Sequence, residues 1–292
     1  MSKKVTELID LDLGFYRKAN RDLKKLSDND CLFHYYNHGY WEGRQTNSYC
    51  TREGLIKSLG GKRALELGPF CNPALSGEHI AYFDVLNREQ LVERGKVLGM
   101  NTANTPSIDY VSPTGDLSSI DAKFDVIFSS HNIEHQPDLI AHFAAASALL
   151  ERGGVYALVV PDYRLCFDAL LPASRISQVL EAHEERRRLH SMASVIDHRA
   201  LTTHNEAPAH WAQIRADKPV YTPLDVNRVR GAIEEYRASG DGYLDVHAWQ
   251  FEPFTFADIL SCLIDLGLLG FSEVRVAGPV MGRNEFTAQL IK

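Results

Sequence analysis

The sequence lacks the long apolar runs and the apolar leader that mark membrane and secreted proteins. No stretch approaches the roughly 20 consecutive apolar residues that a membrane-spanning helix needs. The first seven residues, Met-Ser-Lys-Lys-Val-Thr-Glu, contain no apolar core of a signal peptide. We therefore expect a cytoplasmic protein with no membrane span.

Positive charge is also scarce. Lysine and arginine total 31 against 38 aspartate and glutamate residues, which gives a formal net charge of −7. Domains that bind nucleic acid usually carry an extended basic patch or stripe. The acidic balance therefore predicts that nucleic acid is not a partner, although it leaves a local basic pocket open.

Cysteine pairs and metal-binding repeats are missing as well. The five cysteines are scattered and never form a Cys-x-x-Cys pair, so neither a disulfide framework nor a zinc site is indicated. We expect small thiols that are buried or partly buried. His-x-His and His-Glu-x-x-His spacings are absent too, and the sequence names no metal ligand set.

What the sequence does contain is a regular alternation of short apolar runs and helical patterns. Residues 87–98 and 137–151 are expected to be helices, the second starting at Pro137 and ending at Gly153-Gly154. Strands alternating with helices at this spacing predict right-handed βαβ units and a mostly parallel sheet. The five expected strands of this part are residues 63–67, 80–85, 108–111, 124–129 and 155–160.

Four segments follow from this alternation. The sheet is preceded by an amphipathic helix or helix pair over residues 5–26 and an aromatic, histidine-rich stretch over 32–44, which is typical of a packing face. After Pro161 the alternation stops, and a polar stretch too long for a bare loop predicts an inserted cap. A helix over 255–266 and strands over 271–276 and 284–291 then complete the sheet. The predicted segments are a helical N-terminal arm (1–60), a core (61–162), an inserted substrate cap (163–253) and a C-terminal completion of the core (254–292).

The predicted fold class is thus α/β, with a Rossmann-like, mostly parallel seven-stranded sheet and helices on both of its faces. Around residue 66 a short apolar strand runs into an acid and a glycine turn, Glu66-Leu67-Gly68. In such sheets ligands bind at the carboxyl ends of the strands, where a glycine lets backbone approach them closely. Asp84 ends the second strand, at the offset from which a carboxylate can accept both ribose hydroxyls of a nucleotide.

Four ordered elements carry a family resemblance. Glu66-x-Gly68, Asp84, Gly115-Asp116-Leu117 and the run Phe-Asp-Val-Ile-Phe-Ser-Ser-His-Asn-Ile-Glu-His-Gln-Pro-Asp over residues 124–138 resemble a class I S-adenosylmethionine-dependent methyltransferase. The resemblance covers residues 62–162 and about the last forty. It implies that the cofactor is S-adenosyl-L-methionine, that the product is S-adenosyl-L-homocysteine, and that the cofactor is held by Glu66, Gly68, Pro69, Asp84, Val85, Asp116, Leu117, Ser130 and His131.

One departure from the family lies in the cofactor turn. Pro69-Phe70-Cys71 stand where the family usually has further glycines, which makes the loop stiffer. The missing glycines also disfavour binding of a nicotinamide dinucleotide.

Enzymes of this class transfer the methyl group by direct displacement, so a hydroxyl acceptor needs a base. Histidine is the side chain best suited near neutral pH, and His131 and His135 follow the fourth strand. The sugar O-methyltransferases that this chain resembles place a histidine after strand four and an acid after strand five against the acceptor, which adds Asp162. His247 in the cap is the next candidate. A Glu-His pair at this place also occurs in members where it only packs.

The cap supplies the candidates for acceptor binding. Aromatic rings beside aspartate and histidine commonly hold sugars, and they serve equally well to pack a cap onto its domain. Alternating polar and aromatic residues over 243–251 predict an extended strand that presents one such face. A divalent metal bound by Asp162, His204 or His247 stays an open alternative, which no metal-binding motif in the sequence supports. The candidate substrate-binding residues are Tyr163, Arg164, His204, His210, Trp211, Tyr243, Asp245 and Trp249.

We therefore expect an S-adenosylmethionine-dependent O-methyltransferase that acts on a hydroxyl of a sugar or glycan, in bacterial polysaccharide or glycoside biosynthesis. The partner is a small-molecule or glycan acceptor, and the aromatic N-terminal arm suits a homodimer. Two alternatives stay open. One is methylation of another small hydroxylated metabolite, and the other is a non-catalytic protein of this fold that serves as an interaction surface in a glycan-assembly complex.

Overall fold

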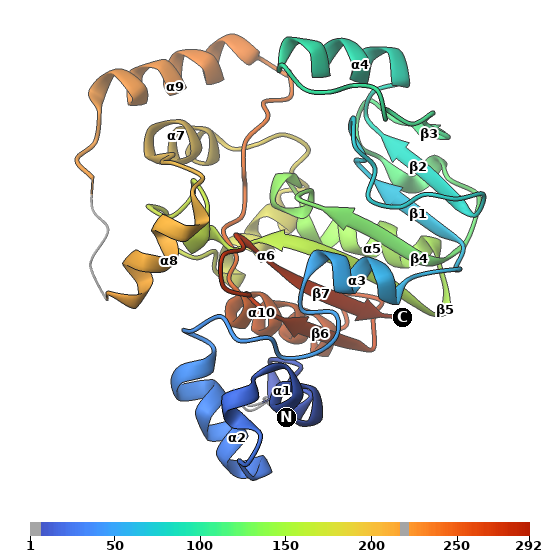
Figure 1. Cartoon of the computed structure of the whole chain (residues 1–292). Coiled ribbons are helices and arrows are strands. Elements are labelled where there is room, and N and C mark those ends of the chain that lie inside the picture. The colour runs from blue at the N-terminus through green and yellow to red at the C-terminus, as the bar shows by residue number, and fades with distance from the viewer. Residues whose placement is uncertain (1–6, 217–221) are drawn as a thin grey trace.

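A seven-stranded sheet runs through the centre of the computed structural model, which describes residues 7–216 and 222–292 (Figure 1). The strand order is β3-β2-β1-β4-β5-β7-β6. Neighbours among β1 to β5 pair in parallel, whereas β7 is antiparallel to both β5 and β6. This confirms the predicted Rossmann-like α/β fold. The strands are β1 (Ala64–Leu67), β2 (Ile80–Asp84), β3 (Tyr110–Val111), β4 (Phe124–Ser130), β5 (Leu150–Pro161), β6 (Glu273–Ala277) and β7 (Glu285–Ile291).

Both faces of the sheet are covered by helices because the central strands are apolar on both sides. On one face, α3 (Arg52–Ser58) packs on a core that includes Val126 and Phe128 of β4. On the other, α5 (Leu139–Leu149) and α10 (Pro253–Asp265) pack on a larger core that includes Ile127. Such burial on both faces is what a parallel strand requires. A further helix, α4 (Arg88–Val97), connects β2 to β3 and starts with a capping box between Asn87 and Gln90.

The N-terminal part is helical, and the helix or helix pair predicted over residues 5–26 corresponds to two short helices with narrower limits, α1 (Leu13–Ala19) and η2 (Arg21–Leu23). Residues 5 and 6 lie outside the described residues, and the first helix begins only where the Asp12 carboxylate caps it. The next elements are α2 (Asp28–His34) and the π-turn η3 (Tyr35–Gly39). Tyr35 and Tyr40 of the aromatic stretch are buried, so much of that stretch packs against the rest of the protein.

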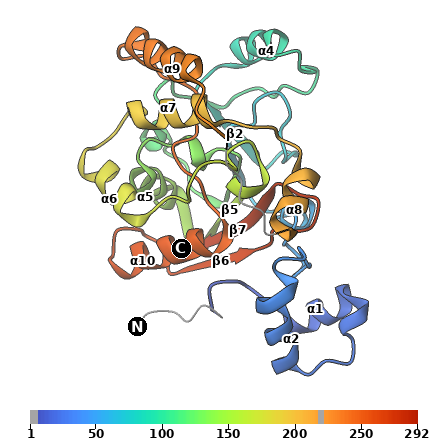
Figure 2. The ribbon, with the colours of Figure 1, turned by 90° about the vertical axis from the view of Figure 1, so that its left-hand side faces the viewer.

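The described residues between β5 and α10 form four α-helices. They are α6 (Ile176–Glu184), α7 (Met192–Leu201), α8 (Ala207–Arg215) and α9 (Val226–Ser239), preceded by η6 (Tyr163–Leu165). Helices α7 and α9 pack together, and the Arg199–Glu235 ion pair of 2.9 Å joins them. Figure 2 shows α9 near α4, at the end of the molecule opposite α1 and α2.

Two predicted boundaries near β5 are corrected. Helix α5 begins at Leu139 because the Asp138 side chain caps it, so Pro137 lies before the helix. Gly153 and Gly154 do not end that helix either. They lie inside β5, where Gly153 has a φ of +76° and the pairing with β4 shifts register. A bulge in a strand needs the same glycine freedom as a helix end, which explains the misreading.

The strand predicted over residues 243–251 is not formed. Only Phe251 makes a bridge, to Asp162. The amide groups of this segment are bonded to loops and side chains instead, such as Ala248 to the Glu134 carbonyl and Gln250 to the Ser174 hydroxyl. The predicted common face is therefore absent, because Tyr243 is exposed and Trp249 is buried.

No helix among the described residues combines the length and the apolar character that a membrane crossing requires.

Candidate active site

The candidate site lies where β1, β2 and β4 end. The pairing of β1 with its two parallel neighbours places Gly68, Asp84 and Ser130 at one level, each directly after the paired residues. Three chain segments that follow neighbouring strands thus meet at one edge of the sheet. In open α/β sheets this is the edge at which ligands bind.

The turn after β1 is built around Gly68. Its φ of +67° favours glycine, and a Cβ at this position would stand 3.0 Å from the Asn132 side chain of the turn after β4. Glu66 is buried, and its two carboxylate oxygens accept the Ala74 and Leu75 amides at 2.8 Å each. Burial raises the pKa of Glu66 against the opposing effect of these amides. Glu66 therefore fixes the chain that follows the turn.

Asp84 stands beside this turn and is 7% exposed. It accepts the Leu86 amide at 3.2 Å, and the Phe70 amide also bonds to it. Burial raises the pKa of Asp84 despite these amides. Val85 is exposed next to it, and Pro69 of the turn is buried. A carboxylate at this place can accept further hydrogen bonds from a ligand.

Asp116 and Leu117 follow β3. The Asp116 carboxylate caps the short helix η4 (Leu117–Ser119), accepting the Ser118 amide at 2.8 Å and the Ser118 hydroxyl at 2.9 Å. Both of its oxygens are thus engaged within the loop, and this hydrogen bonding lowers its pKa. Leu117 is buried. A ligand at this end of the site would meet backbone groups rather than a free carboxylate.

His131 follows Ser130 directly and has a φ of +50°, which is uncommon for a residue with a side chain. Its Nε2 donates to Glu285 Oε2 at 2.9 Å, and Arg52 binds both oxygens of Glu285 at 2.6 and 3.0 Å. Burial raises the pKa of Glu285, but the contacts with His131 and Arg52 outweigh it and bring the pKa to about 2. An ionised Glu285 can only accept, so Nε2 of His131 carries the proton and Nδ1 is left free.

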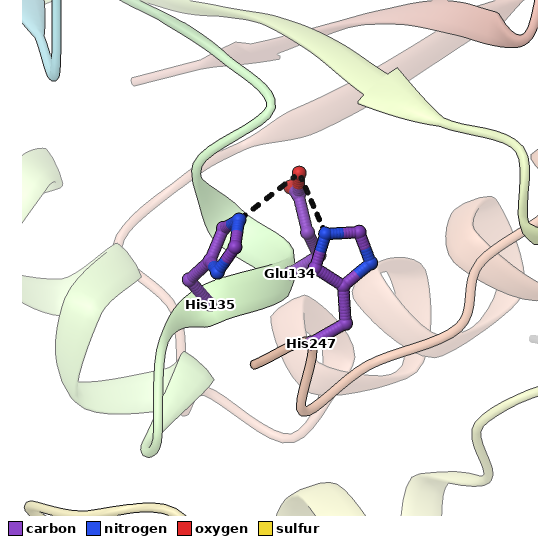
Figure 3. Close-up of side chains that lie close together, drawn as sticks. All are labelled: Glu134, His135 and His247. Atoms are coloured by element: carbon purple, nitrogen blue, oxygen red, sulfur yellow. Dashed lines mark ion pairs between the residues drawn. The ribbon is translucent and has the colours of Figure 1, made fainter. Parts of the chain in front are cut away.

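Figure 3 shows Glu134, His135 and His247 pointing toward one another. Glu134 Oε1 lies 3.8 Å from His135 Nε2 and 3.9 Å from His247 Nε2. The outer nitrogens of both rings face other carboxylates: Asp245 at 3.1 Å and Asp168 at 2.6 Å. Burial lowers the pKa of His135, yet the contacts with Asp245 and Glu134 raise it above its usual value.

Arg94 connects this cluster to the turn after β1. Its guanidinium binds Asp245 at 2.6 Å and lies over the Phe70 ring, 5.9 Å from the ring centre. The contact with His135, together with Arg94, holds the pKa of Asp245 well below its usual range although burial opposes them. The turn after β1 and the histidine cluster are thus joined both here and through Asn132.

Asp162 belongs to a different network. Its carboxylate is fully buried and accepts two hydrogen bonds from Arg164, at 2.8 and 2.6 Å. Arg164 also donates to the Tyr40 hydroxyl, which in turn donates to Glu252 at 2.7 Å. The predicted catalytic acid thus joins the N-terminal helices to the start of α10, and its oxygens face a guanidinium.

We expect Asp162→Ala to lower the free energy of unfolding by about 3–5 kcal/mol, because it leaves the Arg164 charge buried without its partner. Urea unfolding followed by circular dichroism measures this. As the control, Lys96→Ala removes one member of the exposed Glu93–Lys96 pair and should change the free energy by less than about 0.5 kcal/mol. Equal stability of the two variants would show that the buried pair does not hold these segments together.

Most other predicted acceptor-binding residues lie in η6, in α8 or just before α8. The His204 and His210 rings stack at 4.1 Å, and Trp211 Nε1 donates to the Arg283 carbonyl. His204 and Asp162 therefore have partners of their own, and neither belongs to the cluster around His247. Tyr163, Arg164 and His210 line a hollow of about 450 Å³.

Tyr243 and Trp249 are placed differently. Tyr243 is 52% exposed and its ring lies 5.3 Å from that of His190. Trp249 is buried, and its Nε1 donates to the Gln136 carbonyl at 2.6 Å. Trp249 therefore holds the loop after β4, which carries Glu134 and His135.

No protein-family model matches the chain, and no curated protein sequence matches it significantly. Among solved structures it is similar to a S-adenosylmethionine-dependent methyltransferase from Clostridium acetobutylicum, with 18% identity and a TM-score of 0.27 over 37% of this chain and 46% of that one. It is similar to the CurJ carbon methyltransferase, with 12% identity and a TM-score of 0.39; the match covers 82% of this chain and 52% of that one. It is also similar to a putative O-methyltransferase from Nostoc punctiforme, with 11% identity and a TM-score of 0.38; the match covers 82% of this chain and 55% of that one. The chain spans about half the length of these structures, and likenesses this low say nothing of substrate or activity.

Sequence reasoning missed the acidic partners of the histidines. Glu285 and Asp168 are separated from His131 and His247 by 154 and 79 positions, so no local pattern points to them. Glu134 stood in the Ile-Glu-His motif but was assigned no role of its own. No local signal marks it as buried, because its neighbours Asn132, His135 and Gln136 are polar.

Proposed function

We propose that the protein is an S-adenosylmethionine-dependent O-methyltransferase that methylates a hydroxyl of a sugar or glycan. The observation that carries the proposal is the meeting of three features at one sheet edge: the positive-φ Gly68 turn, the buried Asp84 carboxylate and the His131 imidazole. A nucleoside cofactor needs the first two, and a hydroxyl acceptor needs the third.

The residues around the turn fit such a cofactor. Asp84 would accept from the ribose hydroxyls, the backbone at Gly68 and Pro69 would approach the methionine part, and Val85 and Leu117 would border the adenine. Glu66 would act through the turn, since its oxygens hold Ala74 and Leu75. When bound, the cofactor supplies an electrophilic methyl group on a sulfonium.

His131 is the general base of this proposal. Its Nε2 proton is held by Glu285, so Nδ1 has the lone pair that can take the acceptor's hydroxyl proton. Arg52 keeps Glu285 ionised and in place, as the orienting acid does in other histidine bases. His131 is favoured over His135 because it directly follows β4, beside Asn132 and the Gly68 turn.

The surface around α8 supports a carbohydrate acceptor. The hollow lined by Tyr163, Arg164 and His210 offers an aromatic ring beside polar donors, a composition suited to a sugar. Next to His210, Trp211 donates to the carbonyl of Arg283, which is two positions before Glu285, the partner of His131. Helix α8 is thus bonded to the segment that leads into Glu285.

A labelled-methyl transfer assay tests this function. The protein is incubated with S-adenosylmethionine carrying a radioactive methyl group and with a panel of sugars, sugar nucleotides and oligosaccharides, beside non-sugar hydroxylated metabolites. We expect label in the carbohydrate fraction as an alkali-stable ether. Label only in the non-sugar metabolites would contradict the carbohydrate assignment, and no label in any fraction although the cofactor binds would contradict methyl transfer to these acceptors.

A further inference from the structure

Glu134 is a buried acid that lacks a hydrogen-bond partner. The residue is 0% exposed, and neither Oε1 nor Oε2 accepts a hydrogen bond from the described residues. Only its backbone carbonyl is satisfied, by the amides of Ala248 and Trp249. Burying a carboxylate without compensation costs several kcal/mol, so the position requires a positive charge close to these oxygens.

Imidazole nitrogens surround this carboxylate. His135 Nε2, His247 Nε2 and His131 Nδ1 lie 3.8, 3.9 and 4.0 Å from Glu134 Oε1. Each distance is too long for a hydrogen bond. They are close to the separations between ligands that share one metal ion, since bonds of 2.0–2.2 Å to a tetrahedral ion leave its ligand atoms about 3.4 Å apart.

The outer nitrogen of each ring faces a carboxylate. His135 Nδ1 faces Asp245, and His247 Nδ1 faces Asp168 at 2.6 Å. A carboxylate on the outer nitrogen fixes the proton there and leaves the inner lone pair free, which is the usual support for a metal-binding histidine. For His247 this support is a hydrogen bond, whereas His135 Nδ1 faces Asp245 without one; the inner nitrogens of both rings lie beside Glu134.

We propose that Glu134, His135 and His247 bind one divalent first-row transition-metal ion. These three residues each offer a ligand atom within 4.8 Å of the others. Two imidazoles and one carboxylate form a ligand set of the kind found in catalytic zinc sites, where a further coordination position stays open. Imidazole ligands favour such ions over Mg²⁺ or Ca²⁺, which prefer oxygen.

The charges of the surrounding acids support a divalent ion. Glu285 is balanced by Arg52, and Asp245 by Arg94. Glu134 and Asp168 are both buried, and neither pairs with a lysine or arginine among the described residues. Two buried carboxylates thus lack a lysine or arginine partner, and a 2+ ion would supply positive charge beside them.

A second group, Asp168, His198 and His247, is also close enough to hold an ion. Its members are largely engaged with one another, because Asp168 Oδ2 bonds to His247 Nδ1 and His198 Nδ1 accepts the His247 amide, so Asp168 Oδ1 is its one carboxylate oxygen without a hydrogen-bond partner among the described residues. The oxygens of Glu134 have no such partner. The ion therefore belongs on the Glu134 side of His247, with Asp168 as the support of that ring.

The role of the ion rests on the proposed methyl transfer, whereas its binding does not. Bound at the open position, an acceptor hydroxyl would lose its proton more easily, and His131 stands across from the ligands to receive that proton. Binding is measured on the protein alone, without cofactor or acceptor, so failure of the metal site and failure of methyl transfer give different results.

Titration with Co²⁺ tests the site. Chelator-treated, dialysed full-length protein is titrated with CoCl₂ while the visible absorption of the ion is followed, and Zn²⁺ is then added as competitor. We expect one Co²⁺ per chain with the intense visible bands of a four- or five-coordinate nitrogen site, displacement by Zn²⁺, and no displacement by a large excess of Mg²⁺.

Variants locate the ion. Loss of an outer carboxylate typically weakens metal binding 10–100-fold, so Asp168→Asn should weaken Co²⁺ binding by that factor, and Glu134→Gln and His247→Ala by at least about 100-fold. His79→Ala, which removes an exposed imidazole outside the cluster, should bind as the wild type does. Circular dichroism melts check that each variant is folded, and Glu134→Gln keeps the shape of the side chain. Absence of visible bands in the wild type, or equal affinity in the folded Glu134→Gln protein, would overturn the proposal.

Discussion

Asp84→Ala should lower the affinity for S-adenosylhomocysteine by roughly 100-fold. In the proposed function the Asp84 carboxylate accepts hydrogen bonds from two ribose hydroxyls. Hydrogen bonds to a charged group contribute about 1.5–3 kcal/mol each. A loss of about 3 kcal/mol corresponds to roughly a 100-fold change in the dissociation constant. Isothermal calorimetry of both proteins at one pH and one salt concentration measures the difference.

The control for this prediction is Asp121→Ala, which removes an exposed carboxylate located before β4 begins, away from the carboxyl ends of the strands. Its affinity should equal that of the wild type. The affinity of Asp84→Asn, which keeps one acceptor oxygen, should lie between those of the wild type and Asp84→Ala. Unchanged binding in a folded Asp84→Ala protein would remove the ribose role, even if the protein bound the nucleoside elsewhere.

His131→Ala should lower kcat by about 10²–10⁴-fold, the usual contribution of a positioned general base. The cofactor's affinity should change far less, because the Gly68 turn and Asp84 stay in place. Single-turnover transfer to whichever acceptor takes the label in the panel measures kcat, and calorimetry measures binding. His183→Ala, which alters a histidine paired with Asp138 at the start of α5, is the matched control and should keep full turnover.

Glu285→Gln refines the same prediction. It keeps an acceptor for His131 Nε2 but removes the charge that favours a protonated imidazole, so its kcat should fall by less than that of His131→Ala. Full turnover in folded His131→Ala protein would exclude this residue as the base. The remaining candidates would then be His135 and His247.

The sheet could be predicted because its strands are local apolar runs. The predicted β1, β2, β4 and β7 differ from the observed strands by one residue at a terminus. The parallel pairing of β1, β2 and β4 follows from the alternation of strands and helices along the chain. The ends of helices were harder to predict where a capping side chain determines the first residue of the helix. Asp12 and Asp138 cap α1 and α5 through bonds that periodicity does not reveal, so both starts were misplaced.

The misplaced strand over residues 243–251 has a different origin. The sequence there does alternate, but its residues make contacts with different parts of the protein. Asp245 contacts Arg94 and His135, whereas Trp249 donates to the Gln136 carbonyl. A period of two residues predicts a strand only when a neighbouring strand is present to pair with it.

The site shows the same division between local and distant information. Gly68, Asp84 and His131 lie at the ends of β1, β2 and β4, which are neighbours in the parallel part of the sheet, so their meeting follows from the fold. The partners that define the chemistry come from elsewhere in the sequence. The closing of β7 beside β5 brings Glu285 to His131, and the return of the chain after α9 brings His247 to Glu134. Spacing alone therefore indicated no metal ligands.

The most direct test of the central claim is a calorimetric titration of the wild-type protein with S-adenosylhomocysteine, beside parallel titrations with NAD and ATP. The account predicts saturable binding of S-adenosylhomocysteine at a single site per chain, with no comparable binding of the other two nucleotides. Absence of S-adenosylhomocysteine binding, or equally tight binding of NAD, would contradict the assignment of this sheet edge as an S-adenosylmethionine site.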